Sequence, residues 1–414
     1  MRWLRTLYLA NGVIYGTVGA FGAVVLTWHG FDAPLVATTT ALGSMVFWVA
    51  LPVWGHLGDA VVGTRRALQL AAIPASLATL CLVLPAPALL IVLFALASSA
   101  TGGSIGALTD AQAVSGLTDP RREYGRLRVL GSLSAGLVAL GAGLVYDRSG
   151  YFLAPILGAA ATISVVLIAG RIPDRKGDFK PRRQAVMDTE PGESAAAFRH
   201  GRFGSVSDAL HGRPRLIAIL VGCLGIFIGI MGGGTFVTLK LQALGGGPST
   251  IGLANGIGAT AEVPGMIVAG WLAGRFGIKP VLGVCGVGLA AVLCTWALAT
   301  EPMLIVATKI VAGLCFAGIT VSFVVMMATM LPQRLVSTGQ TLYQSVAFGG
   351  GAILANMAGA FIFRLGGFEV VFWFLAGATL VGCLVTVLAV PEHSRAAQVA
   401  LEPAPTEALP VAGS

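Results

Sequence analysis

The chain has 414 residues, of which 56% are hydrophobic and only 11% are charged. Soluble globular proteins carry about 25% charged residues, so this composition excludes a soluble enzyme, a nucleic-acid-binding domain and a disordered protein. The net charge of +8 does not indicate a nucleic-acid partner, because the basic residues are concentrated at one side of the predicted membrane spans.

Membrane spans are the first feature of the sequence. A spanning helix needs about 20 mostly apolar residues, and backbone in lipid must hydrogen-bond to itself. Twelve segments meet this requirement: 6–28, 34–55, 67–85, 88–111, 127–146, 150–170, 215–239, 249–272, 279–299, 302–328, 338–362 and 369–390. The sequence therefore predicts an all-α membrane protein with twelve transmembrane helices.

The basic residues predict the orientation of these helices. With the N-terminus in the cytoplasm, 22 of the 26 Lys and Arg residues fall on the cytoplasmic side and three on the opposite side. Cytoplasmic loops of membrane proteins carry this excess of positive charge. We therefore expect a multi-pass protein of the cytoplasmic (inner) membrane, in contact with the lipid bilayer, with both termini cytoplasmic.

A polar stretch divides the predicted spans into six and six. We expect an N-terminal half at 1–170, a cytoplasmic linker at 171–214, a C-terminal half at 215–390 and a disordered tail at 391–414. Two pairs of similar motifs support a duplicated six-helix unit, because Gly55 and Gly270 are 215 residues apart and Gly125 and Gly339 are 214 apart. Two parallel halves of this kind are typical of secondary transporters.

Several short motifs carry a resemblance to a known family. They are Gly55 to Arg66 (GHLGDAVVGTRR), Glu123 to Ser132 (EYGRLRVLGS), Leu239 to Gly245 (LKLQALG), Ala261 to Pro264 (AEVP) and Thr338 to Tyr343 (TGQTLY). Over residues 1–390 the chain resembles the major facilitator superfamily. More narrowly, it is similar to the branch with lactose permease-like, nucleoside–proton symporter and phenylpropionate permease-like transporters. The resemblance implies two pseudo-symmetric halves and, as usual in the superfamily, a functional monomer.

The first of these motifs contains candidate gating residues. The resemblance implies that Asp59, Arg65 and Arg66 hold the cytoplasmic side shut, through charge-assisted bonds and a helix dipole. The alternative is that the two arginines only follow the positive-inside pattern. The second copy has Gly274 in place of Asp59, so we expect the lock on one half only.

Asp110 and Arg128 are candidates for a charge pair in the substrate site. They are 18 residues apart, on the predicted fourth and fifth helices, as in the sugar-binding pair of the lactose permease-like branch. A charge inside the bilayer is costly, so it is normally paired and faces a cavity. Alternatively, both residues are surface charges at the cytoplasmic interface. Ala135 stands where that branch has a sugar-stacking Trp, which argues against a galactoside substrate.

Glu262 and Lys309 are charged residues inside predicted spans. Apolar surroundings favour the protonated form of a carboxyl group, so Glu262 is a candidate for proton coupling or substrate binding. The alternative is a purely structural hydrogen-bonding role. Lys309 is either the counter-ion of Glu262 or of an anionic substrate, or its amine reaches the outer interface.

Polar side chains within the spans complete the candidate site. Helices 1 and 11 line the cavity in the resembled superfamily, which singles out Asn11, Tyr15, Gln340 and Gln344. We expect no metal and no cofactor, because no His or Cys residues have ligand spacing and the Gly-rich stretches lack the Lys-Ser/Thr of a phosphate-binding loop.

The sequence thus predicts a non-enzymatic secondary transporter. We expect it to import a small organic solute with protons by alternating access around a cavity at the bilayer midplane. Two alternatives remain: a proton-coupled antiporter that exports a drug-like metabolite, and a non-transporting scaffold or sensor on the same fold.

Overall fold

The computed structural model describes residues 2–116, 120–172, 210–331 and 333–390. Within these ranges the side chains of 59–60, 114–126, 333–334 and 336–337 are not described. Most of the predicted linker and the whole predicted tail lie outside the described residues. The regular elements of the described chain are all helical.

Eight α-helices and two short π-helices make up the first part of the described chain. They are α1 (Arg2–Ile14), η1 (Tyr15–Gly19), α2 (Gly22–Trp28), α3 (Ala33–His56), η2 (Leu57–Val61), α4 (Thr64–Cys81), α5 (Ala88–Gly102), α6 (Ser104–Gly116), α7 (Pro120–Ser149) and α8 (Leu153–Gly170). The first predicted span is therefore interrupted by a π-turn and a bend at Ala20 and Phe21, and the fourth is interrupted at Gly103.

The second part of the described chain repeats this long-helix pattern. Its elements are α12 (Pro214–Ala243), α13 (Pro248–Phe276), α14 (Ile278–Leu298), α15 (Pro302–Met330), α16 (Gln333–Gln344), η3 (Ser345–Gly350) and α17 (Gly351–Ala389). The backbone departs from helical geometry inside α17 at Gly366 and Gly367, where φ is −159° and 65°. Only the second of these lies in the left-handed region that glycine adopts without strain.

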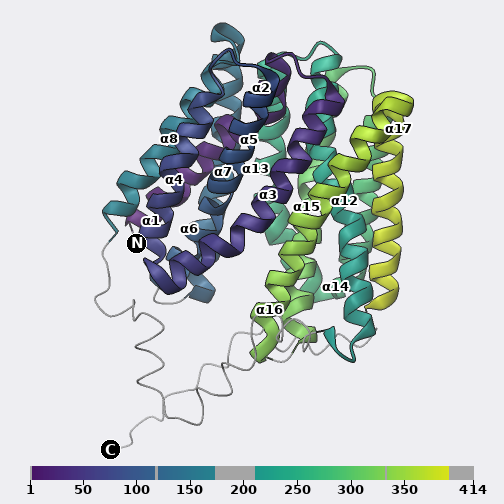
Figure 1. The fold of residues 1–414 in the computed structure, drawn as a ribbon. Helices are drawn as coiled ribbons and strands as arrows, with labels where there is room; N and C mark the ends of the chain where they lie inside the picture. The colour runs from purple at the N-terminus through teal and green to yellow at the C-terminus, as the bar shows by residue number, and fades with distance from the viewer. Residues whose placement is uncertain (1, 117–119, 173–209, 332, 391–414) are drawn as a thin grey trace, which may run out of the picture.

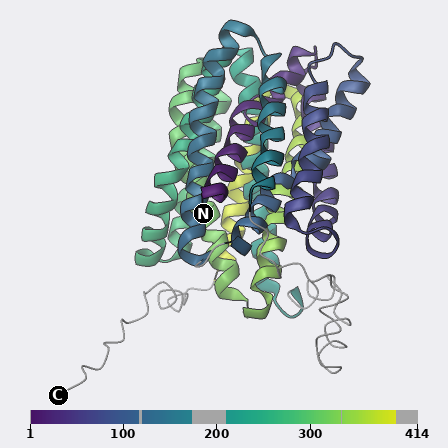
Figure 2. The ribbon, with the colours of Figure 1, turned by 90° about the vertical axis from the view of Figure 1, so that its left-hand side faces the viewer.

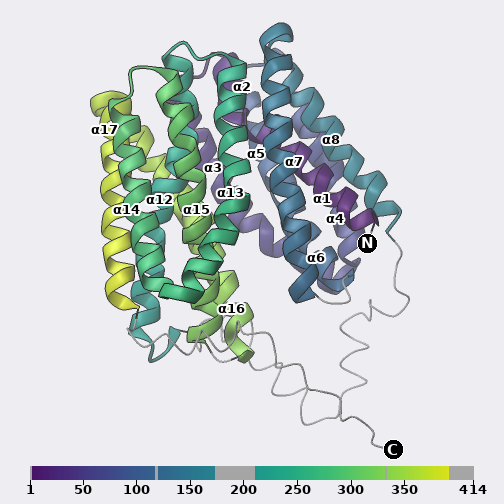
Figure 3. The same ribbon diagram turned by 180° about the vertical axis from the view of Figure 1, so that it is seen from behind.

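The helices form one bundle in which the two parts of the chain lie side by side. In Figure 1, α1 and α4–α8 occupy one side, α12 and α14–α17 the other, and α3 and α13 lie between them. Figure 2 shows the helices running side by side with their ends at two opposite levels, and Figure 3 shows α7 beside α13 from behind. We call the level that holds the turn after α2 the His29 end, and the level that holds the start of α4 the Arg65 end.

Ten helices of the described chain are long and apolar enough to cross a membrane. This number differs from the twelve predicted spans for two reasons. Residues 338–389 count as one segment of 52 residues, although they contain the break at Gly366 and Gly367. Helix α4 does not qualify, because its first turn carries Arg65 and Arg66.

Turns with left-handed glycines recur at a nearly constant spacing along the chain. Gly30 and Gly245 have φ of 85° and 81° and are 215 residues apart. Gly63 and Gly277 have φ of 87° and 88° and are 214 apart, and each directly precedes a helix, α4 or α14. Gly150 and Gly367, with φ of 88° and 65°, are 217 apart.

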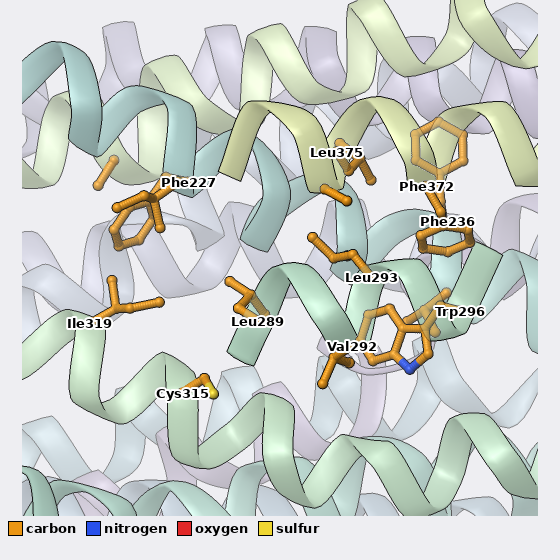
Figure 4. Close-up of a cluster of buried hydrophobic side chains, with 14 of the residues drawn as sticks. Phe227, Phe236, Leu289, Val292, Leu293, Trp296, Cys315, Ile319, Phe372 and Leu375 are labelled. Carbon is orange, nitrogen blue, oxygen red and sulfur yellow. The ribbon is translucent and has the colours of Figure 1, made fainter. Parts of the chain in front are cut away.

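Aromatic and aliphatic side chains form the core of the second part of the bundle (Figure 4). The cluster includes Phe227 and Phe236 from α12, Leu293 and Trp296 from α14 and Phe372 from α17, with the Trp296 and Phe372 ring centroids 6.0 Å apart. All five side chains are at most 3% exposed. A separate buried cluster joins α1, α4, α6, α7 and α8 in the first part of the chain.

Small residues let α7 and α13 touch through their backbones. A Cβ atom added to Gly252 would lie 2.5 Å from the Ala139 carbonyl oxygen, and one added to Gly136 would lie 2.7 Å from the Thr260 methyl group. Glycines at helix interfaces of membrane proteins allow such close approach. We call this contact the α7–α13 seam.

Candidate functional site

Asp110 and Arg128 form an ion pair between α6 and α7. Arg128 Nη1 donates to Asp110 Oδ2 at 3.5 Å, and the hydroxyl group of Tyr8 on α1 donates to Asp110 Oδ1. The Asp110 side chain is 31% exposed and the Arg128 side chain 54%, so a small molecule can reach both charged groups. The structure thus brings together the two charges that the 18-residue spacing singled out.

The position of Arg128 on α7 directs it toward the space between α1 and α13. Residues seven or eleven positions apart share a helix face. Arg128 shares its face with Ala135, whose carbonyl oxygen lies near Gly16, and with Ala139, whose carbonyl oxygen lies near Gly252. Arg128 therefore projects from the strip of α7 between its contacts with the first span and with α13.

Asn11 and Tyr15 lie next to this ion pair. A Cβ atom on Gly106 would be 3.2 Å from Tyr15 Oη and 3.8 Å from Asn11 Nδ2. Gly106 is one helical turn before Asp110 on α6, so both polar side chains reach the same part of the bundle. Tyr15 is 54% exposed and interacts electrostatically with Arg128 and Asp110.

Glu262 lies in the middle of α13 and faces the first part of the chain. It is seven residues after Asn255, whose side-chain amide donates to the Ala20 carbonyl oxygen at 3.1 Å, so the two share a helix face. Glu262 is half-buried, and the described chain offers it no hydrogen bond or ion pair within 4.0 Å. It interacts electrostatically with Arg128 and with Lys309.

Lys309 lies on α15, on the His29 side of Glu262. Its Cδ atom would be 3.6 Å from a Cβ atom on Gly258, which is one turn before Glu262 on α13. Its Nζ atom lies over the Trp296 ring, 5.2 Å from the centroid, and forms no hydrogen bond or ion pair within the described residues. The aliphatic part of the Lys309 side chain therefore packs along α13 and against Trp296. Its amine lies about one helical turn from Glu262 along α13. We call Asp110, Arg128, Glu262 and Lys309 the charged cluster.

The structure places Gln340 and Gln344 differently from each other. Gln340 Nε2 donates to the Val324 carbonyl oxygen of α15 at 2.7 Å, so this side chain ties α16 to α15. Gln344 is exposed at the end of α16, directly before η3.

The candidate gating residues lie at the Arg65 end. Arg65 donates to the Gly170 and Ile172 carbonyl oxygens, at 2.7 and 3.1 Å, and so satisfies the C-terminus of α8. Arg66 is exposed. Asp59 is part of η2, and its side chain is not described. The gating role of Asp59, Arg65 and Arg66 therefore stays a prediction.

Three residues near the charged cluster were missed by sequence reasoning. They are Tyr8, which bonds Asp110, Gly106, which makes room for Tyr15, and Trp296, which packs under Lys309. Tyr8 has a detectable signal, because it precedes Asn11 by three residues and Tyr15 by seven on one helical face. Gly106 and Trp296 have none, because their roles depend on tertiary neighbours.

Replacing Tyr8 with phenylalanine is expected to weaken solute binding. Tyr8→Phe removes one hydrogen bond to a charged oxygen, which is worth about 1.5–3 kcal/mol, and releases Asp110 from its fixed orientation. We expect the solute concentration for half-maximal uptake to rise about tenfold. Tyr146→Phe is the matched control, because the Tyr146 hydroxyl group is buried without a partner in the described chain. Equal uptake curves for both variants would contradict this role.

Comparison with known proteins agrees with this architecture. The model of the family described as "MFS_1 like family" matches residues 2–376. A maltose permease from Geobacillus stearothermophilus is 26% identical over 349 residues, which are 84% of this chain and 84% of that protein.

Three groups of solved structures share the fold. The nucleoside transporter NupG superposes with a TM-score of 0.69 at 16% identity, over 94% of this chain and 98% of that chain. A POT family transporter in complex with a thioalcohol-conjugated peptide gives 0.70 at 12% identity, over 94% and 96%. A D-xylose–proton symporter gives 0.66 at 15% identity, over 94% and 96%.

Proposed function

The chain belongs to the MFS_1-like family and is a membrane-embedded secondary transporter, and from that premise we propose that it carries a small organic solute inward together with protons. The observation that supports proton coupling is the environment of the Glu262 carboxyl group. A carboxyl group at membrane depth, accessible and without a hydrogen-bond partner in the described chain, is suited to take up and release a proton.

We further propose that the chain crosses the membrane twelve times in two six-helix halves. A straight helix of 52 residues would be about 78 Å long, more than twice the hydrocarbon thickness of about 30 Å. The break at Gly366 and Gly367 therefore divides residues 338–389 into two crossings. Helix α4 is the remaining crossing, because α3 ends and α5 begins at opposite levels of the bundle.

The recurring left-handed glycines support two equivalent halves. Three pairs spaced by 214 to 217 residues occupy turns between successive helices, and this spacing matches the 214 and 215 of the sequence motifs. We propose halves over 1–170 and 215–390, separated by the linker that the sequence predicts at 171–214, most of which lies outside the described residues.

The Arg65 end is assigned to the cytoplasm. Arg65, Arg66, Arg171, Arg215 and Arg275 lie at this level, at the starts and ends of α4, α8, α12 and α13. The positive-inside rule places such residues at the cytoplasmic face. The N-terminus would then lie in the cytoplasm, and the His29 end would lie on the outer side of the membrane.

Three hydrogen bonds of the described residues join the two parts of the chain at the proposed outward-facing end. Thr27 bonds Gln242 at 2.9 Å, Asn255 donates to the Ala20 carbonyl oxygen at 3.1 Å, and the Ser249 amide donates to Asp147 Oδ1 at 3.1 Å. All three lie between the charged cluster and the His29 end. Alternating access requires them to break when the outward-facing side opens.

The test is proton movement in proteoliposomes. Purified protein is reconstituted with an internal pH dye and challenged with sugars, nucleosides, peptides and organic acids. Symport predicts that one solute acidifies the lumen as it enters, whereas a change of opposite sign indicates antiport. Uptake of labelled solute without any pH change would overturn proton coupling.

A further inference from the structure

The surroundings of Lys309 raise the question of what balances its charge. The Trp296 ring covers one side of the amine, and Gly258 leaves room for the stem. Within the described chain no carboxylate lies within 4.0 Å of the amine, and the acid that acts on it electrostatically is Glu262. An ammonium group at membrane depth needs a counter-charge, because an unpaired ion in low dielectric is costly.

The charged cluster contains two acids and two bases, but they are not equally paired. Asp110 and Arg128 are joined by an ion pair at 3.5 Å, and Asp110 is also held by Tyr8. Glu262 and Lys309 interact across a greater distance, with Arg128 as the second cation near Glu262. The ionised Glu262 therefore balances Lys309 without making direct contact with it.

Protonation of Glu262 changes this balance by one unit. The neutral acid no longer compensates Lys309, whereas Asp110 continues to compensate Arg128. One positive charge is then left uncompensated on the half-buried Lys309, between Trp296 of α14 and Gly258 of α13. A single anionic group is the ligand that restores neutrality.

We propose that the transported solute carries one carboxylate, and that this group binds beside Lys309 when Glu262 is protonated. This inference rests on the proposed proton-coupled transport and specifies its substrate class. Proton and anion then bind together, since each removes the electrostatic cost that the other creates. A neutral solute leaves Lys309 uncompensated in the protonated state and binds weakly. The site thereby differs from what the name of the maltose permease relative indicates, because maltose is uncharged.

The experiment measures binding without any proton gradient. The thermal unfolding midpoint of the detergent-purified full chain is recorded with matched pairs of acids and amides: propionate and propionamide, lactate and lactamide, benzoate and benzamide, nicotinate and nicotinamide. At pH 6 we expect at least one carboxylate to raise the unfolding midpoint by about 2–5 °C. The matching amide is expected to leave the midpoint unchanged. The apparent affinity should fall as the pH rises, by up to about tenfold per pH unit, because one proton is bound with each anion.

Variants of Lys309 identify the group that binds the anion. Lys309→Gln is expected to abolish the shift caused by the carboxylate, and Lys309→Arg, which keeps the charge, to retain part of it. Arg364→Gln is the matched control, because Arg364 is an exposed cation in the second part of the chain near the His29 end. The comparison of acid and amide on the unmodified chain needs no variant, so a folding defect in Lys309→Gln does not compromise the test.

Three outcomes overturn the proposal: amides that stabilise as well as their acids, carboxylates that produce no shift, and a full shift in Lys309→Gln. The assay also separates this inference from the proposed function. A carboxylate that binds at Lys309 but enters proteoliposomes without protons leaves the anion site standing and removes proton coupling. A neutral solute that drives proton flux leaves proton coupling standing and removes the anion site.

Discussion

Glu262→Gln is expected to abolish uphill accumulation of the solute while exchange of internal for external solute continues. The amide has nearly the shape of the protonated acid but cannot release a proton, so the carrier stays in the state that binds solute. We expect accumulation against a gradient to fall to the level of empty liposomes, and exchange to stay within about threefold of the unmodified chain. The measurement is labelled-solute uptake in proteoliposomes, with and without an imposed pH gradient.

Glu301→Gln is the control for this variant. Glu301 is an exposed acid directly before α15, so the same chemical change there should leave both modes of transport intact. Loss of exchange together with accumulation in Glu262→Gln would assign Glu262 to solute binding alone. Persistence of both would remove Glu262 from the transport cycle.

Gly252→Val is expected to hold the chain open at the His29 end and to stop transport. In the structure a Cβ atom at this position meets the Ala139 carbonyl oxygen at 2.5 Å and the Gly143 Cα atom at 2.9 Å, so a branched side chain forces α7 and α13 apart. We expect a loss of uptake of about tenfold or more. Because the seam joins the two parts of the chain, the energetic cost falls on the closed conformation and not on the fold of either part.

The opening is measured by labelling Asn255→Cys with a membrane-impermeant maleimide added from outside. Labelling should become about fivefold faster or more in the presence of Gly252→Val, above the background of the six native cysteines. The matched control is Gly270→Val on the same helix, where an added Cβ atom has nothing within 4 Å. Equal labelling rates in the two variants would show that the seam does not control the closed end.

The helices were largely predictable from the sequence, and the reasons are local. Runs of about 20 apolar residues specify a spanning helix by hydropathy alone, and the predicted 302–328 and 215–239 lie within α15 and α12. The interruptions were not predicted. The π-turn at Tyr15–Gly19 and the break at Gly103 leave the apolar pattern unchanged and depend on how neighbouring helices pack.

The candidate site was predictable where charge at membrane depth marks it. Asp110, Arg128, Glu262 and Lys309 stand out in apolar sequence because an ion there has a high cost. The structure pairs Asp110 with Arg128 and places Lys309 against α13, one turn from Glu262. Polar uncharged residues carry a weaker signal, since they serve both packing and binding. Gln340 thus bonds a backbone carbonyl group, whereas Tyr8, which was not singled out, holds Asp110.

The equal number of acids and bases in the charged cluster bears on the energy source of transport. With all four groups ionised their charges cancel, so reorientation of the empty site moves no net charge through the membrane field. A proton on Glu262 together with one carboxylate beside Lys309 preserves that cancellation. The membrane potential, worth about 2.3 kcal/mol per charge at 100 mV, then contributes nothing to accumulation. The carrier would draw on the pH difference alone, and its accumulation ratio would follow that difference at any voltage.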